Sequence, residues 1–150
     1  MIAFPNAKIN LGLNIVSKRE DGYHNIESCF YPIPWHDCLE VIAATSFAFK
    51  SYGLDIPGDT SSNLCVKAYE LLKADFDIPP VAIHLLKNIP MGAGLGGGSA
   101  DGAFTLKMLN DLFAIEEANG ARIGILSSPA PVHSVWVGKG VAGLSLLLIS

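Results

Sequence analysis

The sequence predicts an α+β domain, and three observations support this fold class. Residues 6–16 alternate polar and apolar side chains, which is the period of a β-strand with two different faces. Residues 81–86 form a second alternating run that is rich in β-branched side chains. Residues 63–73 place apolar side chains at helical spacing. The chain of 150 residues is 50% hydrophobic and 16% charged, which is typical of one globular domain with a sizeable core.

The overall composition excludes several classes of protein. A formal net charge of −4 argues against a general nucleic-acid surface. The apolar run at the N-terminus is too short for a signal peptide, and no stretch approaches the length of a membrane span. Cys29, Cys38 and Cys65 are odd in number and form no CxxC pair, so we expect reduced, mostly buried thiols rather than a disulfide framework or a zinc site. We therefore expect a cytoplasmic protein that has neither nucleic acid nor a membrane as a partner.

The polar face of the first strand has two interpretations. Lys8 and Asn10 share this face, and Ile9 and Leu11 lie on the other. The strand could simply be half-exposed at a surface. Alternatively, Lys8 and Asn10 point into a site where an anionic substrate and a phosphate meet. A lysine at such a site would place a positive charge beside a transferring phosphoryl group or lower the pKa of a hydroxyl.

A charged turn over residues 17–24 predicts a hairpin. Asp21-Gly22 is a strong turn signal, and an apolar run to Ile33 follows it as the second strand. On the residues alone, Tyr23 and His24 are surface residues of this hairpin. A further turn and strand follow near residues 35–42, and one short strand is expected at residues 47–50.

The middle of the chain contains a capped helix. Asn63 is well placed as the N-cap of the helix over residues 63–73, and Pro79-Pro80 requires a turn before the strand at residues 81–86. His36 and His84 have no partners at the spacing of metal ligands, so core or surface positions are expected for them.

A glycine-rich loop follows the strand at residues 81–86 and precedes a helix that we expect to begin near Ser99. Five of the ten residues from Ile89 to Gly98 are glycine. Glycine can adopt positive φ and has no Cβ, so the backbone N–H groups of such a loop can closely approach a bound anion. The helix N-terminus adds unpaired N–H groups and a partial positive charge, and Ser99 could cap this helix or reach a metal bound to phosphate. A triphosphate would fit this arrangement.

A flexible loop without a ligand is disfavoured for this stretch, because glycine runs cost backbone entropy and this one joins a strand to a helix. The loop also differs from two common phosphate-binding motifs. It lacks the Lys-Ser/Thr end of a Walker A motif. Gly92, Gly94 and Gly97 match the spacing of a dinucleotide fingerprint, which is a weak signal when it occurs alone. About 20 residues further on, only Glu116 and Glu117 are acidic.

The loop resembles the ATP-binding loop of the GHMP kinases, a superfamily of small-metabolite kinases that includes galactokinase, homoserine kinase and mevalonate kinase. The resemblance implies that ATP and Mg²⁺ are bound here, with Ser99 as a ligand of the metal. It also implies the fold of a GHMP kinase N-terminal domain, a ribosomal-protein-like βαβ arrangement with a mixed sheet backed by helices. The residues that would hold ATP are Pro90, Met91, Gly92, Ala93, Gly94, Leu95, Gly96, Gly97, Gly98, Ser99 and Ala100.

The block Asp21-Gly-Tyr-His, together with Leu95-Gly-Gly-Gly-Ser, is similar to one branch of this family. That branch phosphorylates a hydroxyl of a small molecule carrying a cytidine diphosphate group, in the non-mevalonate route to isoprenoid precursors. The resemblance implies that Lys8 is catalytic and that Asn10, Tyr23 and His24 bind the substrate. Stacking on a base suits Tyr23, and hydrogen bonding to a base edge suits His24. A GHMP kinase for another small alcohol is the alternative, and the Asp-Gly-Tyr-His block argues against it.

The resemblance ends near Phe113. We therefore divide the chain into residues 1–113, a GHMP kinase N-terminal ATP-binding domain, and residues 114–150, a divergent tail, and we expect no C-terminal GHMP domain. Relatives would continue with a segment that carries an aspartate as catalytic base, whereas the last aspartate here is Asp111. One interpretation, which we favour, is that the tail is out of frame; the other is a natural short form with strands near 123–126 and 132–137. An inactive nucleotide-binding remnant is therefore an alternative function.

Overall fold

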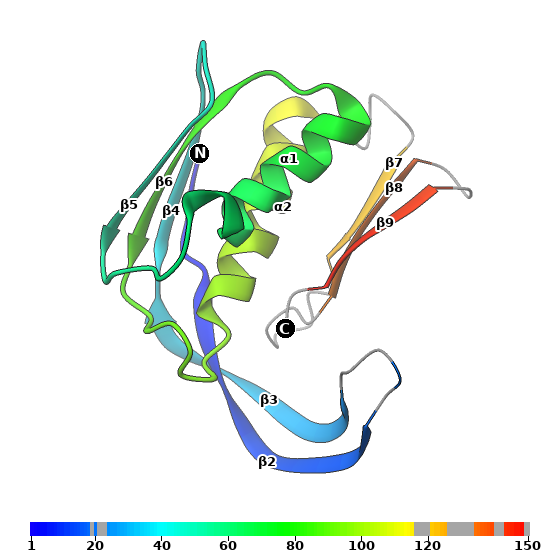
Figure 1. Cartoon of the computed structure of the whole chain (residues 1–150). Coiled ribbons are helices and arrows are strands. Elements are labelled where there is room, and N and C mark those ends of the chain that lie inside the picture. Colours follow the sequence, from blue (N-terminus) through cyan, green and yellow to red (C-terminus); the bar gives the residue numbers. More distant parts are fainter. Residues whose placement is uncertain (19, 21–23, 116–120, 126–133, 140–142, 149–150) are drawn as a thin grey trace.

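The computed structural model describes residues 1–18, 20, 24–115, 121–125, 134–139 and 143–148. Its centre is a four-stranded mixed sheet with two helices packed against one face (Figure 1). The strand order is β1 (Ile2–Ala3), β4 (Cys38–Ala43), β6 (Val81–Lys87) and β5 (Ala48–Gly53). β5 and β6 are parallel, whereas β4 is antiparallel to both of its neighbours. The predicted α+β fold with a mixed sheet backed by helices is confirmed.

The two helices follow the strands of the parallel pair. α1 (Leu64–Phe76) begins after a short 3₁₀ turn, η1 (Thr60–Ser62), and connects β5 to β6. Asn63 is its N-cap, as predicted, and the Asn63 side chain accepts a hydrogen bond of 2.9 Å from the backbone N–H of Cys65. α2 (Gly97–Phe113) follows β6. The core between the sheet and the helices is built from buried residues of both layers, among them Leu39, Val41, Tyr69, Leu72, Ile83, Leu85, Leu106 and Leu109.

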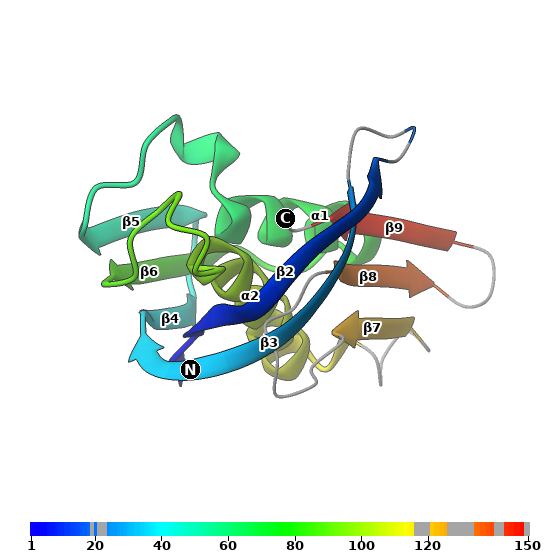
Figure 2. The ribbon, with the colours of Figure 1, turned by 90° about the horizontal axis from the view of Figure 1, so that it is seen from below.

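A long two-stranded ribbon extends from the sheet (Figure 2). It consists of β2 (Asn6–Lys18) and β3 (His24–His36), which pair antiparallel, so the predicted hairpin is confirmed. The turn with Tyr23 lies outside the described residues. Apart from Ala7, which is buried at the start of the strand, the apolar side chains of β2 are exposed: Ile9, Leu11 and Ile15 are 38%, 52% and 60% exposed. Both faces of most of this ribbon are therefore accessible.

The ribbon also accounts for one wrong prediction about the cysteines. Cys29 lies on β3 and is exposed, Cys38 is half-buried and Cys65 is buried, so the expectation of mostly buried thiols fails at Cys29. The sequence predicts the strand correctly, but in the described part of the chain the side chain of Cys29 is exposed.

The tail contains three further strands. β7 (Ala121–Ile125), β8 (Ser134–Lys139) and β9 (Gly143–Leu148) form an antiparallel sheet in chain order. The two strands expected for a short natural form correspond approximately to β7 and β8. Glu116 and Glu117 lie outside the described residues.

Candidate functional site

The glycine-rich loop joins the end of β6 to the start of α2. Gly92, Gly94 and Gly96 adopt φ values of 73°, 71° and 72°, so the predicted left-handed conformation is confirmed at these three positions. The same expectation is wrong for Gly97 and Gly98, because both belong to α2. Gly97 serves close packing instead, since a Cβ there would lie 2.8 Å from Cγ2 of Ile89. The loop has the backbone conformation that anion-binding nests require.

Ser99 does not cap the helix that follows the loop. α2 begins at Gly97, and its N-cap is Gly96, which makes no side-chain capping bond. Ser99 is the third helical residue, with 7% of its surface exposed. The capping prediction is therefore wrong, because the helix starts two residues earlier than its apolar pattern indicated. The first N–H groups of α2 nevertheless lie directly after the loop, where a helix N-terminus favours an anion.

Lys8 connects the ribbon to this loop. Its backbone N–H donates to the carbonyl of Leu95 at 2.8 Å, and its Nζ donates to the carbonyl of Gly94 at 2.7 Å. The Nζ also donates to Oδ1 of Asn10 at 2.7 Å, so the two residues share one face as predicted. Lys8 is only 7% exposed, and burial lowers the pKa of its ammonium. The structure thus places one ammonium group directly at the left-handed part of the loop.

His24 lies far from this group. It is exposed at the first position of β3 and pairs with Lys18 at the other end of the ribbon from Lys8. Lys18 lies ten positions after Lys8, which corresponds to roughly 30 Å measured along the strand, and the ribbon curves between them (Figure 1). Figure 1 shows the ribbon extending below the central sheet and α2. Of the residues expected to bind substrate, the structure therefore brings only Asn10 to Lys8, and Tyr23 is outside the described residues.

A pocket of about 70 Å³ opens beside the loop. Its walls are mostly apolar and come from the segment before α1, from the loop and from α2. Asn63, the N-cap of α1, contributes a polar group to the same wall. The lining residues are Ile56, Pro57, Ser62, Asn63, Leu64, Met91, Gly98 and Asp101.

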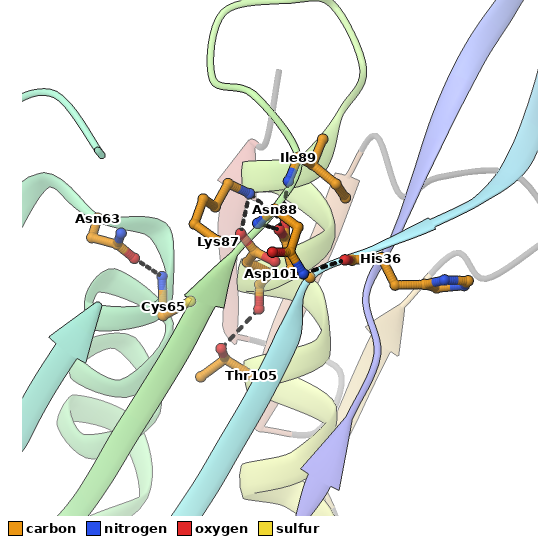
Figure 3. Close-up of polar contacts among 9 residues, drawn as sticks. His36, Asn63, Cys65, Lys87, Asn88, Ile89, Asp101 and Thr105 are labelled. Carbon is orange, nitrogen blue, oxygen red and sulfur yellow. Dashed lines mark hydrogen bonds and ion pairs between the residues drawn. The ribbon is translucent and has the colours of Figure 1, made fainter. Parts of the chain in front are cut away.

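A buried ionic cluster lies beneath the loop, and the sequence analysis missed it. Lys87, at the end of β6, donates from Nζ to Oδ2 of Asp37 at 2.5 Å and to Oδ2 of Asp101 at 2.7 Å. Lys87, Asp37 and Asp101 are 1%, 0% and 2% exposed. Figure 3 shows Lys87 and Asp101 lying side by side, with Asn88 and Ile89 at the beginning of the loop. The cluster joins the strand before the loop to the helix after it.

Asp37 also binds the loop backbone directly. Its Oδ1 accepts hydrogen bonds from the backbone N–H groups of Asn88 at 2.6 Å and Ile89 at 2.8 Å. In contrast, Oδ1 of Asp101 is buried and has no hydrogen-bond partner among the residues that the structure describes. Burial would lower the pKa of Lys87, but the charges and hydrogen bonds of Asp101 and Asp37 outweigh it, so this pKa is raised. Burial raises the pKa of Asp101 to about 7, with the charge of Asp37 adding to the effect and Lys87 opposing it.

One sequence signal could have revealed the cluster. Lys87 continues the alternation of Val81, Ile83 and Leu85, so it occupies the inward-facing register of β6. A lysine in a buried register needs an acidic partner. Which acids supply it could not be read from the sequence, since Asp37 lies 50 residues away along the chain.

The chemistry available at this site is that of anion binding. Among the residues that the structure describes, no three His, Cys, Asp or Glu side chains could jointly hold a metal ion. Mg²⁺ is commonly held by substrate phosphates with only one or two protein groups, and a single hydroxyl from Ser99 is compatible with that mode. Within the described part of the chain, no helix is both long and apolar enough to cross a membrane.

Comparison with known proteins identifies relatives of this chain. The family model for the GHMP kinases N terminal domain matches residues 63–130. A protein of Cytophaga hutchinsonii named 4-diphosphocytidyl-2-C-methyl-D-erythritol kinase is 65% identical over 116 residues, which cover 77% of this chain and 43% of that protein. A protein of the same name from Parabacteroides distasonis is 58% identical over 116 residues, with the same coverage. The chain spans less than half the length of these relatives.

Solved structures show the same fold. A crystal structure titled 4-(cytidine 5'-diphospho)-2C-methyl-D-erythritol kinase superposes with a TM-score of 0.63 at 33% identity, covering 98% of this chain and 55% of that chain. A putative homoserine kinase from Listeria monocytogenes superposes with a TM-score of 0.52 at 18% identity, over 98% of this chain and 52% of its own. The second likeness shows the fold alone.

Proposed function

The chain carries the N-terminal domain of a GHMP kinase, and from this premise we propose that it binds ATP at the glycine-rich loop. We propose further that the bound nucleotide donates its γ-phosphoryl group to a hydroxyl of 4-diphosphocytidyl-2-C-methyl-D-erythritol, the compound that appears in the names of the relatives. Residues 1–113 would form the ATP-binding domain, and residues 114–150 a tail that diverges from the relatives.

The contact between Lys8 and the loop is the observation that carries the proposal. The ammonium of Lys8 lies 2.7 Å from the carbonyl of Gly94. This carbonyl belongs to a loop that has three left-handed glycines and leads directly into the N-terminus of α2. Phosphoryl transfer is accelerated mainly by positioning and by positive charge beside the transferring group. Lys8 supplies such a charge, and because it is largely buried the charge acts in a poorly solvated environment.

The other parts of the nucleotide have matching surroundings. The loop from Pro90 to Ala100 would hold the phosphates, and the small apolar pocket beside it would receive one edge of the base. When Mg²⁺ is bound, it neutralises phosphate charge, and Ser99 would supply a protein oxygen to it.

The substrate would extend from the loop along the ribbon. Asn10, fixed by its bond to Lys8, would orient the reacting hydroxyl. Tyr23 and His24 are proposed to hold the cytidine end, by stacking and by hydrogen bonding respectively. ATP and Mg²⁺ would then lie at the end of the substrate that reacts, and the ribbon would bind the end that carries the base.

A second candidate function is nucleotide binding without transfer. It is favoured by the placement of the buried aspartates near the loop. Transfer requires that the substrate hydroxyl lose its proton, and a carboxylate near the lysine is the usual acceptor. Asp37 and Asp101 are committed to Lys87 beneath the loop and do not contact Lys8.

Single-turnover transfer from labelled ATP to 4-diphosphocytidyl-2-C-methyl-D-erythritol separates these functions. The full chain is tested with Mg²⁺, beside Lys8→Ala and the control Lys107→Ala, which removes a lysine that is 59% exposed on α2. We expect labelled product from the unchanged chain and from Lys107→Ala, and none from Lys8→Ala. Saturable ATP binding with no product from any variant would support the nucleotide-binding function instead.

A further inference from the structure

We propose that Asp37 is the residue that positions the glycine-rich loop for its anionic ligand. The inference rests on the proposed function of the loop and adds to it a residue outside the loop. Asp37 lies between β3 and β4, and its side chain is completely buried. Its carboxylate would act as a shared anchor for the two ends of the loop.

The first step of the argument is the start of the loop. One carboxylate oxygen, Oδ1, accepts hydrogen bonds from two successive backbone N–H groups, those of Asn88 and Ile89. Both bonds are at most 2.8 Å long, which is short for N–H···O and typical of a charged acceptor. Two bonds to consecutive peptide groups fix the direction in which the chain leaves β6.

The second step is the end of the loop. The other oxygen, Oδ2, binds Lys87 at 2.5 Å, and Lys87 in turn binds Asp101 on α2 at 2.7 Å. Nζ of Lys87 also approaches Gly97, the first residue of α2, since a Cβ there would lie 3.0 Å from it. The separation between the two ends of the loop is therefore set by a chain of buried charges that begins at Asp37.

The third step is the ribbon. The backbone N–H of Asp37 donates to the carbonyl of Pro5 at 2.9 Å, immediately before β2 begins. β2 carries Lys8, whose Nζ binds the loop at Gly94. One residue thus holds both the strand that brings the ammonium and the loop that receives it.

A purely structural role predicts a different behaviour. Buried ion pairs often contribute little net stability compared with well-packed apolar residues, so stability alone is a weak explanation for three buried charges beneath a loop. Replacing a residue that only stabilises the fold would lower the free energy of unfolding without changing ligand affinity in the folded molecules. Replacing a positioning residue would lower that affinity as well.

The experiment compares three variants of the full chain. Asp37→Ala removes all the contacts of the carboxylate, and Asp37→Asn keeps an oxygen for the two N–H groups while removing the charge. Leu72→Ala is the control, because it opens a cavity in the core on α1, away from the loop, and destabilises the fold by an unrelated route. Two quantities are measured at a temperature where each variant is folded: the dissociation constant of ATP with Mg²⁺, and the exchange rates of the Asn88 and Ile89 amide protons.

We expect Asp37→Ala to bind ATP at least about tenfold more weakly, comparable to the loss of one charge-assisted hydrogen bond. The two amide protons should exchange faster in this variant than its loss of global stability explains, and Asp37→Asn should show a smaller excess. In Leu72→Ala their exchange should accelerate only as far as its lower free energy of unfolding requires. If Asp37→Ala does not fold, the ATP dissociation constants and amide exchange rates of Asp37→Asn and Leu72→Ala are compared instead, and a weaker affinity in Asp37→Asn alone supports the proposal. Unchanged ATP affinity in the folded Asp37 variants, whatever their amide exchange, would overturn the proposal. A failure of the unchanged chain to bind ATP would refute the function of the loop, and exchange at Asn88 and Ile89 would still test whether Asp37 fixes it.

Discussion

Replacing Lys87 with methionine should severely destabilise the fold. Methionine has a similar length, so the change removes the charge while filling most of the space. It leaves the carboxylates of Asp37 and Asp101 buried, at 0% and 2% exposure, without the cation that both of them bind. Removing one partner of a buried ionic contact costs about 3–5 kcal/mol. A carboxylate left without Lys87 can take up a proton, so we expect a loss of about 3 kcal/mol, at the lower end of that range. This loss is a large share of the roughly 5–15 kcal/mol by which a typical domain is stable.

The chain supplies a matched control for this prediction. Lys107 and Asp111 form a lysine–aspartate contact of 2.6 Å on α2, but their side chains are 59% and 37% exposed. Urea unfolding followed by circular dichroism should show that Lys107→Met costs no more than about 0.5 kcal/mol. Adding Asp37→Asn and Asp101→Asn to Lys87→Met should recover part of the lost stability, because none of the three charges of the cluster then remains buried. Equal losses for the two lysine variants would refute the reasoning from burial.

Two further predictions concern the loop and the cysteines. Gly96→Ala and Gly94→Ala should each cost about 1–2 kcal/mol of left-handed strain, and both losses are measurable by urea unfolding. Gly96→Ala should weaken ATP binding more than Gly94→Ala does, because its Cβ would lie 3.2 Å from Cγ and Cε of Lys8, whereas nothing in the chain lies within 4 Å of a Cβ at Gly94; equal affinities in the two variants would contradict this. Iodoacetamide at pH 8 should modify the exposed Cys29 rapidly, whereas Cys65 should react only after unfolding, because burial raises the pKa of its thiol to about 12 and keeps it protonated. Modification of Cys65 at the rate of Cys29 in the folded chain would show that the core is open.

The sequence predicted best what depends on local spacing. The strand before the loop, the left-handed glycines and the Asn63 cap all follow from patterns within a few residues. The shared face of Lys8 and Asn10 follows from the period of a strand, and the structure shows it as a hydrogen bond of 2.7 Å. Each of these features requires only short-range geometry.

The failures lie where distant segments meet. Asp37 and Lys87 are 50 residues apart, and their contact depends on how β4 pairs with β6, which no local pattern specifies. Cys29 lies in an apolar run that predicts a strand, yet its side chain is exposed, and no local pattern specifies whether another segment covers a strand. The early start of α2 escaped prediction because Gly97 and Gly98 are poor helix formers in isolation, and the tight fit of Gly97 against Ile89 and Lys87 holds them in the helix.

Titration of the ¹⁵N-labelled full chain with ATP and Mg²⁺, followed through its backbone amide resonances, tests the central claim most directly. If the loop binds the phosphates, the amide signals of residues 92–100 should shift together and saturate, and a chain carrying Lys8→Ala should need a higher ATP concentration to reach the same shifts. Saturation at other residues with these signals unmoved, or no saturable shift at all, would contradict the assignment of the glycine-rich loop as the nucleotide site.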